Sequence, residues 1–329
     1  MKKFYIAGIV LFVFAIAAKP FDQFPDAVIT NGLINARLYL PDAKNGYYRA
    51  SRFDWSGVMP ELEYKGHTYF GQWFENYSPT IHDAIMGPVE DFLPVGYDEA
   101  KPGDSFLKIG IGMVTKPVES KYSIVTPYQL INHGTWRIKK KSDQIDFIQK
   151  LNDKKYAYEY KKTIRLVKDK PEMVLLHSLK NTGKETIETN VYNHNFFVMD
   201  KQPIGKDYVV IFPFKLSDEL QQQETFGKIQ DNQILFLKQL SRNENLHFRS
   251  LQGFGDDAKD YDIRIENRKT GAAVRITSDQ PLSRLVFWSA AKTLCPEPYI
   301  HINIKPGEIF KWKISYQFYI CDTVYNKKI

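Results

Sequence analysis

Residues 310–318 read Phe-Lys-Trp-Lys-Ile-Ser-Tyr-Gln-Phe, and apolar and polar side chains alternate through the whole stretch. Successive side chains of a β-strand point to opposite faces of the sheet. Phe310, Trp312, Ile314, Tyr316 and Phe318 therefore share one face, and the lysines and Gln317 share the other. One buried face and one solvated face are typical of an antiparallel sheet in a sandwich.

The second half of the chain repeats this kind of segment. Short runs rich in β-branched and aromatic residues are bounded by turn sequences such as Asn181-Thr182-Gly183-Lys184. We expect strands at residues 162–168, 173–179, 186–197, 208–214, 246–251, 261–267, 273–277 and 283–288. No run of 12 or more residues has a strong helical period. The sequence therefore predicts an all-β protein built as a large antiparallel β-sandwich.

The composition fits this fold class. Of 329 residues, 43% are hydrophobic and 25% are charged, which excludes a disordered or collagen-like chain. Aromatic residues reach 14%, with 22 Phe and 20 Tyr, which favours sheet and suits surfaces that stack on flat ligands. The formal net charge of +7 is too small and scattered for a nucleic-acid partner.

The N-terminus predicts a signal peptide over residues 1–18. Lys2 and Lys3 precede the apolar run 4–18, and Ala15 and Ala17 are small residues at the positions that signal peptidase reads. A transmembrane anchor is the alternative, but the run has 15 residues where a span needs roughly 20. We therefore expect a periplasmic or secreted protein with no stable membrane anchor after cleavage. Residues 19–329 contain no linker-like tract, so we expect a single domain.

Export makes a disulfide between Cys295 and Cys321 chemically possible. If Pro306-Gly307-Glu308 is the turn of a β-hairpin, position 295 lies opposite about position 318, only a few residues from Cys321. We expect a disulfide to be within reach, and two buried free thiols are the alternative.

Most catalytic motifs are absent from the sequence. There is no HExxH, CxxC, GxSxG or glycine-rich phosphate loop, so we expect no metal, no cofactor and no nucleotide chemistry. The contexts of His67, His82, His247 and His301 indicate surface or structural roles. Residues 47–57 and 66–74 gather aromatic, Arg and Gly residues, which is typical either of a core seam or of a surface that meets a planar ligand.

Three other segments carry candidate chemistry. His133 is followed by Gly134 in a turn, and His194 lies in the strand-like run Asn-His-Asn-Phe-Phe. Glu297 stands between two prolines, which predicts a rigid loop that could hold a general base, or simply a solvated carboxylate at a strand entry.

In this order the three segments resemble the aldose 1-epimerase (galactose mutarotase-like) family, from about Asn31 onward. Pro306-Gly307-Glu308 and Tyr316-Gln317-Phe318 match its C-terminal turn and last strand. The resemblance implies a large antiparallel β-sandwich, the galactose mutarotase-like supersandwich. Phe196 replaces a family Tyr, and the arginine-bearing family segment has no match, so Arg49 or Arg52 would serve instead. The resemblance therefore indicates a divergent, exported member.

The resemblance also implies a function, the interconversion of α and β anomers of a free monosaccharide or of an oligosaccharide reducing end. Glu297 would be the base and a protonated His194 the acid, with both groups ionised near neutral pH. The remaining sugar contacts would come from His133, Arg52, Arg49, Phe196 and Trp55.

Two other functions stay open at this stage. A noncatalytic carbohydrate-binding protein could use the same scaffold, as could an accessory domain in polysaccharide degradation. A glycosidase needs two carboxylates about 5 to 10 Å apart, and Asp54, Glu90 or Asp91 could be the partner of Glu297. The sugar itself is not specified, although export favours a neutral or uronic sugar.

Overall fold

The computed structural model describes residues 24–118, 121–220 and 225–323, and the predicted signal peptide lies outside these ranges. The described residues form strands and two short 3-10 turns, η1 (Met199–Lys201) and η2 (Ala258–Asp260). Within these ranges no helix has the length and apolar character needed to span a bilayer.

The larger main sheet has ten antiparallel strands. In spatial order they are β16 (Gly227–Gln230), β17 (Gln233–Phe236), β14 (Tyr208–Ile211), β19 (Asp262–Asn267), β20 (Ala272–Ser278), β23 (Ile309–Ile320), β12 (Glu172–Asn181), β11 (Ala157–Leu166), β10 (Gln144–Asn152) and β9 (Thr135–Lys140). The alternation predicted for β23 is confirmed, because Trp312, Ile314, Tyr316 and Phe318 are buried while the intervening residues are not.

The second main sheet has six antiparallel strands and carries the pocket described below. Their order is β15 (Ser217–Asp218), β18 (Asn245–Gln252), β21 (Arg284–Ala290), β22 (Thr293–Ile304), β13 (Ile187–Phe196) and β5 (Gly87–Phe92). Two smaller sheets come from the first half of the chain: β1 (Asp26–Thr30), β2 (Ile34–Tyr39), β3 (Glu61–Tyr64) and β4 (His67–Thr68), and β6 (Ser105–Lys108), β7 (Gly112–Thr115) and β8 (Leu130–Asn132).

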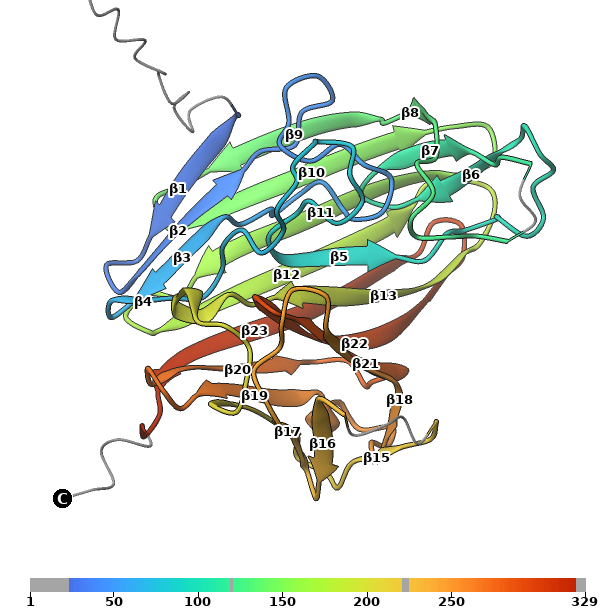
Figure 1. The fold of residues 1–329 in the computed structure, drawn as a ribbon. Coiled ribbons are helices and arrows are strands. Elements are labelled where there is room, and N and C mark those ends of the chain that lie inside the picture. The colour runs from blue at the N-terminus through green and yellow to red at the C-terminus, as the bar shows by residue number, and fades with distance from the viewer. Residues whose placement is uncertain (1–23, 119–120, 221–224, 324–329) are drawn as a thin grey trace, which may run out of the picture.

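The two main sheets pack face to face and enclose the core (Figure 1). Phe92 of β5 meets Trp312 of β23 with ring centroids 6.2 Å apart. Tyr316 Oη of β23 donates a 2.7 Å hydrogen bond to Asn195 Oδ1 of β13. The predicted all-β sandwich is therefore confirmed.

A charged cluster lies buried between the sheets, and we call Glu90, Lys162 and His177 the Glu90 cluster. Lys162 Nζ forms an ion pair with Glu90, and His177 Nε2 lies 2.7 Å from Glu90 Oε1, with all three side chains inaccessible to solvent. Burial alone would raise the pKa of Glu90, but the charge of Lys162 and the hydrogen bond with His177 outweigh burial and lower the pKa to about 2. Glu90 is therefore an ionised carboxylate whose stability in the core depends on its ion pair with Lys162.

The expected hairpin and disulfide are wrong. β22 pairs with β13 and β21, whereas β23 pairs with β12 and β20, so the turn after β22 carries the chain from one sheet to the other. Cys295 is buried in β22 and Cys321 follows β23, and both are free thiols. Alternation predicts that a face is buried, but it does not specify the sheet to which a strand belongs.

Glu297 lies within strand β22, so the expectation that it stands in a rigid loop is wrong. The pairing of β22 with β13 ends at Tyr299–Tyr192, beside the prolines that flank Glu297. Proline has no N–H to donate to a sheet. Instead, Asn195 Nδ2 donates a 3.0 Å hydrogen bond to the Pro296 carbonyl. The two strands are thus joined by side chains where the candidate acid and base lie.

Candidate active site

A pocket of about 410 Å³ lies on the outer face of the six-stranded sheet. Its wall is built from alternate residues of four neighbouring strands, because every second side chain points outward. These are Tyr192, His194 and Phe196 of β13, Glu297 and Tyr299 of β22, Arg284, Val286 and Trp288 of β21, and His247 and Arg249 of β18. The intervening residues of β13 point into the core, where Asn193 Nδ2 donates to Glu90 Oε1.

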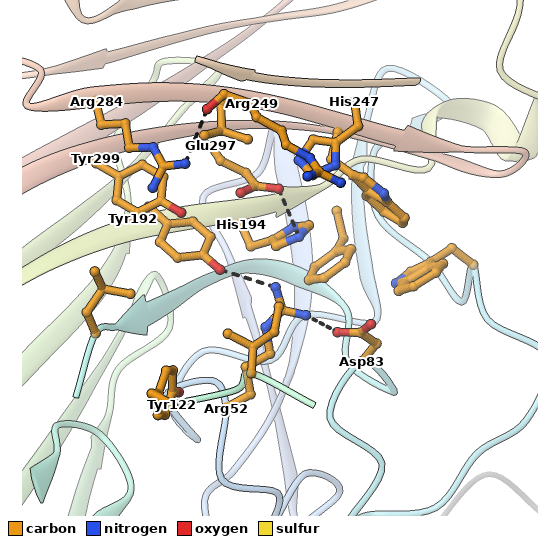
Figure 2. Close-up of a pocket in the computed structure, with 16 residues that line it drawn as sticks. Arg52, Asp83, Tyr122, Tyr192, His194, His247, Arg249, Arg284, Glu297 and Tyr299 are labelled. Carbon is orange, nitrogen blue, oxygen red and sulfur yellow. Dashed lines mark hydrogen bonds and ion pairs between the residues drawn. The ribbon is translucent and has the colours of Figure 1, made fainter. Parts of the chain in front are cut away.

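Segments from the first half of the chain form the opposite wall (Figure 2). Arg52 comes from the connection between β2 and β3, and Trp73 and Asp83 come from the connection between β4 and β5. Trp73 stacks on Phe196, with ring centroids 5.2 Å apart, and its Nε1 donates to the Ile85 carbonyl. The pocket volume is in the range of small-molecule sites.

His194 and Glu297 form the chemical centre of the pocket. His194 Nε2 lies 3.2 Å from Glu297 Oε1, and the two side chains are only 4% and 9% exposed. The imidazole stacks on Phe196 at 3.9 Å between centroids and meets Phe53 edge-on. An acid–base pair is thus held rigidly on two neighbouring strands.

Burial sets the protonation of this pair. It raises the pKa of Glu297 to about 8, even though the positive charge of Arg52 acts in the other direction. Burial and then Arg52 lower the pKa of His194 well below its ordinary value. Near neutral pH the proton therefore lies on Glu297 and the imidazole is neutral. The expectation of an ionised Glu297 and a protonated His194 is wrong for the free protein, because removal of water disfavours both charges.

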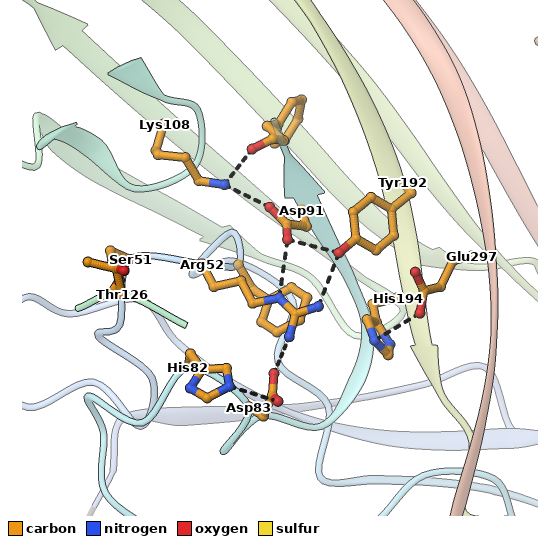
Figure 3. A network of polar contacts seen from close by, with 12 residues as sticks. Ser51, Arg52, His82, Asp83, Asp91, Lys108, Thr126, Tyr192, His194 and Glu297 are labelled. Atoms are coloured by element: carbon orange, nitrogen blue, oxygen red, sulfur yellow. Dashed lines mark hydrogen bonds and ion pairs between the residues drawn. The ribbon is translucent and has the colours of Figure 1, made fainter. Parts of the chain in front are cut away.

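Arg52 is held by a buried polar network (Figure 3). Its guanidinium pairs with Asp83, lies 3.3 Å from Asp91 Oδ2 through Nε, and donates a 3.2 Å hydrogen bond to Tyr192 Oη. Tyr192 Oη in turn donates to Asp91 Oδ2 at 2.9 Å, and Lys108 Nζ donates to Asp91 Oδ1 at 2.7 Å. Two cations and two carboxylates balance one another in this network.

The structure brings together four of the seven residues expected from the sequence: Glu297, His194, Arg52 and Phe196. His133, Trp55 and Arg49 lie outside the pocket lining. His133 is exposed in the turn between β8 and β9, where it faces Trp55 at 6.4 Å between ring centroids. Trp55 is buried, with its Nε1 donating to the Ala50 carbonyl. Arg49 is partly buried beside Pro79. The sequence around His133, Trp55 and Arg49 suggested a binding site, but the fold places these three residues outside the pocket.

The carboxylates considered for a glycosidase also lie outside the lining. Glu90 belongs to the Glu90 cluster, and Asp91 lies behind Arg52. Asp54 Oδ2 accepts hydrogen bonds from Ser56 and Tyr160 in the core. The second carboxylate that does line the pocket, Asp83, is occupied by Arg52 and His82.

Sequence reasoning missed several pocket residues, notably Tyr192, Trp288, Arg249 and Arg284. His247 also lines the pocket, although its context indicated a surface or structural role. The sequence signal that could have found Tyr192 was its spacing: Tyr192 lies two residues before His194 and therefore shares its face.

Across residues 24–118, 121–220 and 225–323, no group of three or more His, Cys, Asp or Glu side chains is placed to hold a metal ion.

Comparison by sequence finds neither a matching family model nor a matching curated protein. Comparison by structure finds many proteins of similar fold, of which three illustrate the likeness. A candidate aldose 1-epimerase from Escherichia coli K12 has 14% sequence identity and a TM-score of 0.55, over 91% of this chain and 100% of the other. A galactose mutarotase-like protein from Lactobacillus casei has 12% identity and a TM-score of 0.53, over 89% and 100%. An aldose epimerase homologue from C. elegans has 13% identity and a TM-score of 0.53, over 91% and 99%.

The fold is that of the galactose mutarotase-like proteins. At these identities the likeness concerns the fold, and the function has to be argued from the pocket.

Proposed function

We propose that the protein is an aldose 1-epimerase that interconverts the α and β anomers of a sugar bound in this pocket. The observation that supports the proposal is the His194–Glu297 pair, an acid and a base 3.2 Å apart in the buried wall of a pocket of about 410 Å³. Anomer exchange requires one proton donor and one proton acceptor beside the same hemiacetal, and no further group.

The pKa directions assign the first step. The protonated Glu297 donates its proton to the ring oxygen, and neutral His194 accepts the proton of the O1 hydroxyl. The bond between C1 and the ring oxygen breaks, and C1 and O1 form an aldehyde. After rotation about the bond between C1 and C2, Glu297 takes back the proton from the hydroxyl oxygen and His194 returns its proton to O1. The ring closes as the other anomer, and both residues regain their starting state.

Arg52 has a defined part in this cycle. When the ring is open, Glu297 is a carboxylate and His194 is an imidazolium, so the pair carries separated charges. The charge of Arg52 favours ionised Glu297 and opposes the imidazolium. Electrostatic stabilisation of a charge that develops during the reaction is a common catalytic contribution. Trp73 and Trp288 supply aromatic surface for the sugar ring.

The proposal is tested with Glu297→Gln and His194→Gln. General acid–base catalysis contributes typically about 10² to 10⁴ in rate, so each variant should lose that much of the catalysed exchange. Because the two side chains act in one proton cycle, the double variant should lose far less than the product of the single losses. Exchange is measured by NMR on freshly dissolved single anomers of hexoses, pentoses and uronic acids.

The same two strands offer a matched control. Glu188 of β13 and His301 of β22 form a second carboxylate–imidazole pair, 3.6 Å apart and exposed at 61% and 48%. Glu188→Gln and His301→Gln should leave exchange unchanged. Wild-type exchange by a folded Glu297→Gln variant would refute the acid–base assignment. A wild-type protein that binds a sugar without exchanging its anomers would be a carbohydrate-binding protein.

A further inference from the structure

Two arginines line the open side of the pocket, and we call Arg249 and Arg284 the rim arginines. Arg249 comes from β18 and Arg284 from the neighbouring β21, and both are exposed. Arg284 donates a 3.2 Å hydrogen bond to the Arg249 carbonyl, and its guanidinium lies over the ring of Tyr299 at 5.2 Å. Figure 2 shows Arg249 beside His247 and Arg284 beside Tyr299, with Glu297 between the two in this view.

The rim arginines differ from the other cations of this region in their partners. Arg52 and Lys108 are balanced by Asp83 and Asp91. In the part of the chain that the structure describes, neither rim arginine forms an ion pair with a carboxylate. Their charges are therefore not neutralised by the pocket itself.

The rest of the pocket does not offset this charge. Burial raises the pKa of Glu297 to about 8, so its carboxyl is protonated near neutral pH. The pKa of His247 falls to about 4, through burial first and then through the charges of Arg249 and Arg284. The rim arginines are thus close enough to affect a neighbour in the pocket, and they leave a positive potential above the acid–base pair.

We propose that the substrate is a sugar that carries an anionic group, which the rim arginines bind while its hemiacetal lies against His194 and Glu297, and that a hexuronic acid is the first candidate. Guanidinium groups bind carboxylate, sulfate and phosphate oxygens by charge-assisted hydrogen bonds. Two of them on adjacent strands form an anion subsite, and the Arg284 guanidinium is held in place by the Tyr299 ring and the Arg249 carbonyl. This inference rests on the proposed function and adds the substrate class.

The test compares matched sugars on the full mature protein. Anomer exchange by NMR and affinity by calorimetry are measured for glucuronate against glucose, galacturonate against galactose, and glucose 6-phosphate and glucose 6-sulfate against glucose. Arg249→Gln, Arg284→Gln and the double variant are compared with Arg137→Gln. Arg137 is an exposed arginine of β9 in the other main sheet and is not part of the pocket lining, so this control removes the same charge outside the pocket.

We expect each rim substitution to weaken uronate binding and turnover by roughly 10- to 100-fold, as the loss of a charge-assisted hydrogen bond does. Neutral sugars and the Arg137 variant should change little, and uronate affinity should fall as ionic strength rises. If the phosphate or sulfate sugar is preferred and depends on the rim arginines, the anion subsite holds and the uronate assignment is wrong.

The inference and the proposed function fail in different ways. Equal losses for neutral and acidic sugars, or no preference of the wild type for an acidic sugar, would overturn the anion subsite while mutarotation stood. Arginine-dependent uronate binding without anomer exchange would overturn the enzyme assignment while the subsite stood. Absence of binding to every acidic sugar would overturn the subsite.

Discussion

Replacement of Lys162 by Met tests whether the buried charges between the sheets are balanced as the structure indicates. Met keeps the length of the side chain and removes its charge, which leaves Glu90 without the ion pair from Lys162 Nζ. The variant also loses the 3.1 Å hydrogen bond from Lys162 Nζ to the Ser56 carbonyl. Removal of one partner of a buried ion pair typically costs about 3 to 5 kcal/mol of the free energy of unfolding.

This cost converts into a shift of the melting temperature. Unfolding entropy near 60 °C is about 2.1 cal/mol/K per residue, or roughly 0.7 kcal/mol/K for a chain of this length. The Lys162→Met variant should therefore melt roughly 4 to 7 °C below the wild type. Calorimetry gives the melting temperature, and urea unfolding gives the free energy of unfolding independently.

A lysine on the neighbouring strand provides the control. Lys150 of β10 pairs with Glu159 at 2.8 Å, but its side chain is 66% exposed. Exposed pairs contribute about 0 to 1 kcal/mol, so Lys150→Met should change the melting temperature by about 1 °C or less. Equal effects of the two substitutions would refute the reasoning, because burial would then not matter.

His177 gives this prediction a pH dependence. Its Nε2 faces Glu90 Oε1 at 2.7 Å, and its pKa is lowered by burial first and also by the charge of Lys162. Without Lys162, His177 can bind a proton and partly replace the lost charge. The destabilisation should therefore be smaller at pH 5 than at pH 8. Addition of Glu90→Gln to Lys162→Met should recover part of the loss, because no unpaired carboxylate is then buried.

Two further predictions concern the pH profile and the cysteines. If protonated Glu297 is the donor at ring opening, the rate of catalysed anomer exchange should be constant near neutrality and fall as pH rises through about 8, where this carboxyl loses its proton. A decline already between pH 6 and 7 would indicate that protonated His194 is the donor. Ellman titration of the denatured, unreduced protein should find two thiols. In the native protein the buried Cys295 should not react, while the partly exposed Cys321 should react slowly. Absence of any thiol in the denatured protein would indicate a disulfide.

The strands of the second half could be predicted because their alternation reflects burial directly. The predicted segment 173–179, for example, lies within β12, and segment 273–277 lies within β20. The first half escaped prediction because its strands are short and separated by long connections. The pairing of the strands could not be predicted from the sequence either, because β22 and β23 follow each other in the chain yet belong to different sheets.

The candidate site could be predicted only in part, as the fold could. His194 and Phe196 share a strand face, so any strand prediction for this segment places them together. Glu297 joined them through the family resemblance, not through spacing. The opposite wall of Trp73, Asp83 and Tyr122 depends on how long connections cross the sheet, which local pattern does not encode. The protonation state of Glu297 could not be predicted from the sequence either, because it depends on burial in the folded pocket.

The two faces of β13 limit how this protein can evolve. Tyr192, His194 and Phe196 face the pocket, while Asn193 and Asn195 hydrogen bond to Glu90 and to the Pro296 carbonyl on the other side. A one-residue insertion or deletion in this strand would turn the asparagines toward the pocket and bury the imidazole in the core. The connections that carry Trp73 and Tyr122 bear no such restriction, because loops accept changes of length at small cost. Descendants of this chain can therefore change the shape of the pocket by remodelling those connections, while His194 and Glu297 stay fixed on their strands.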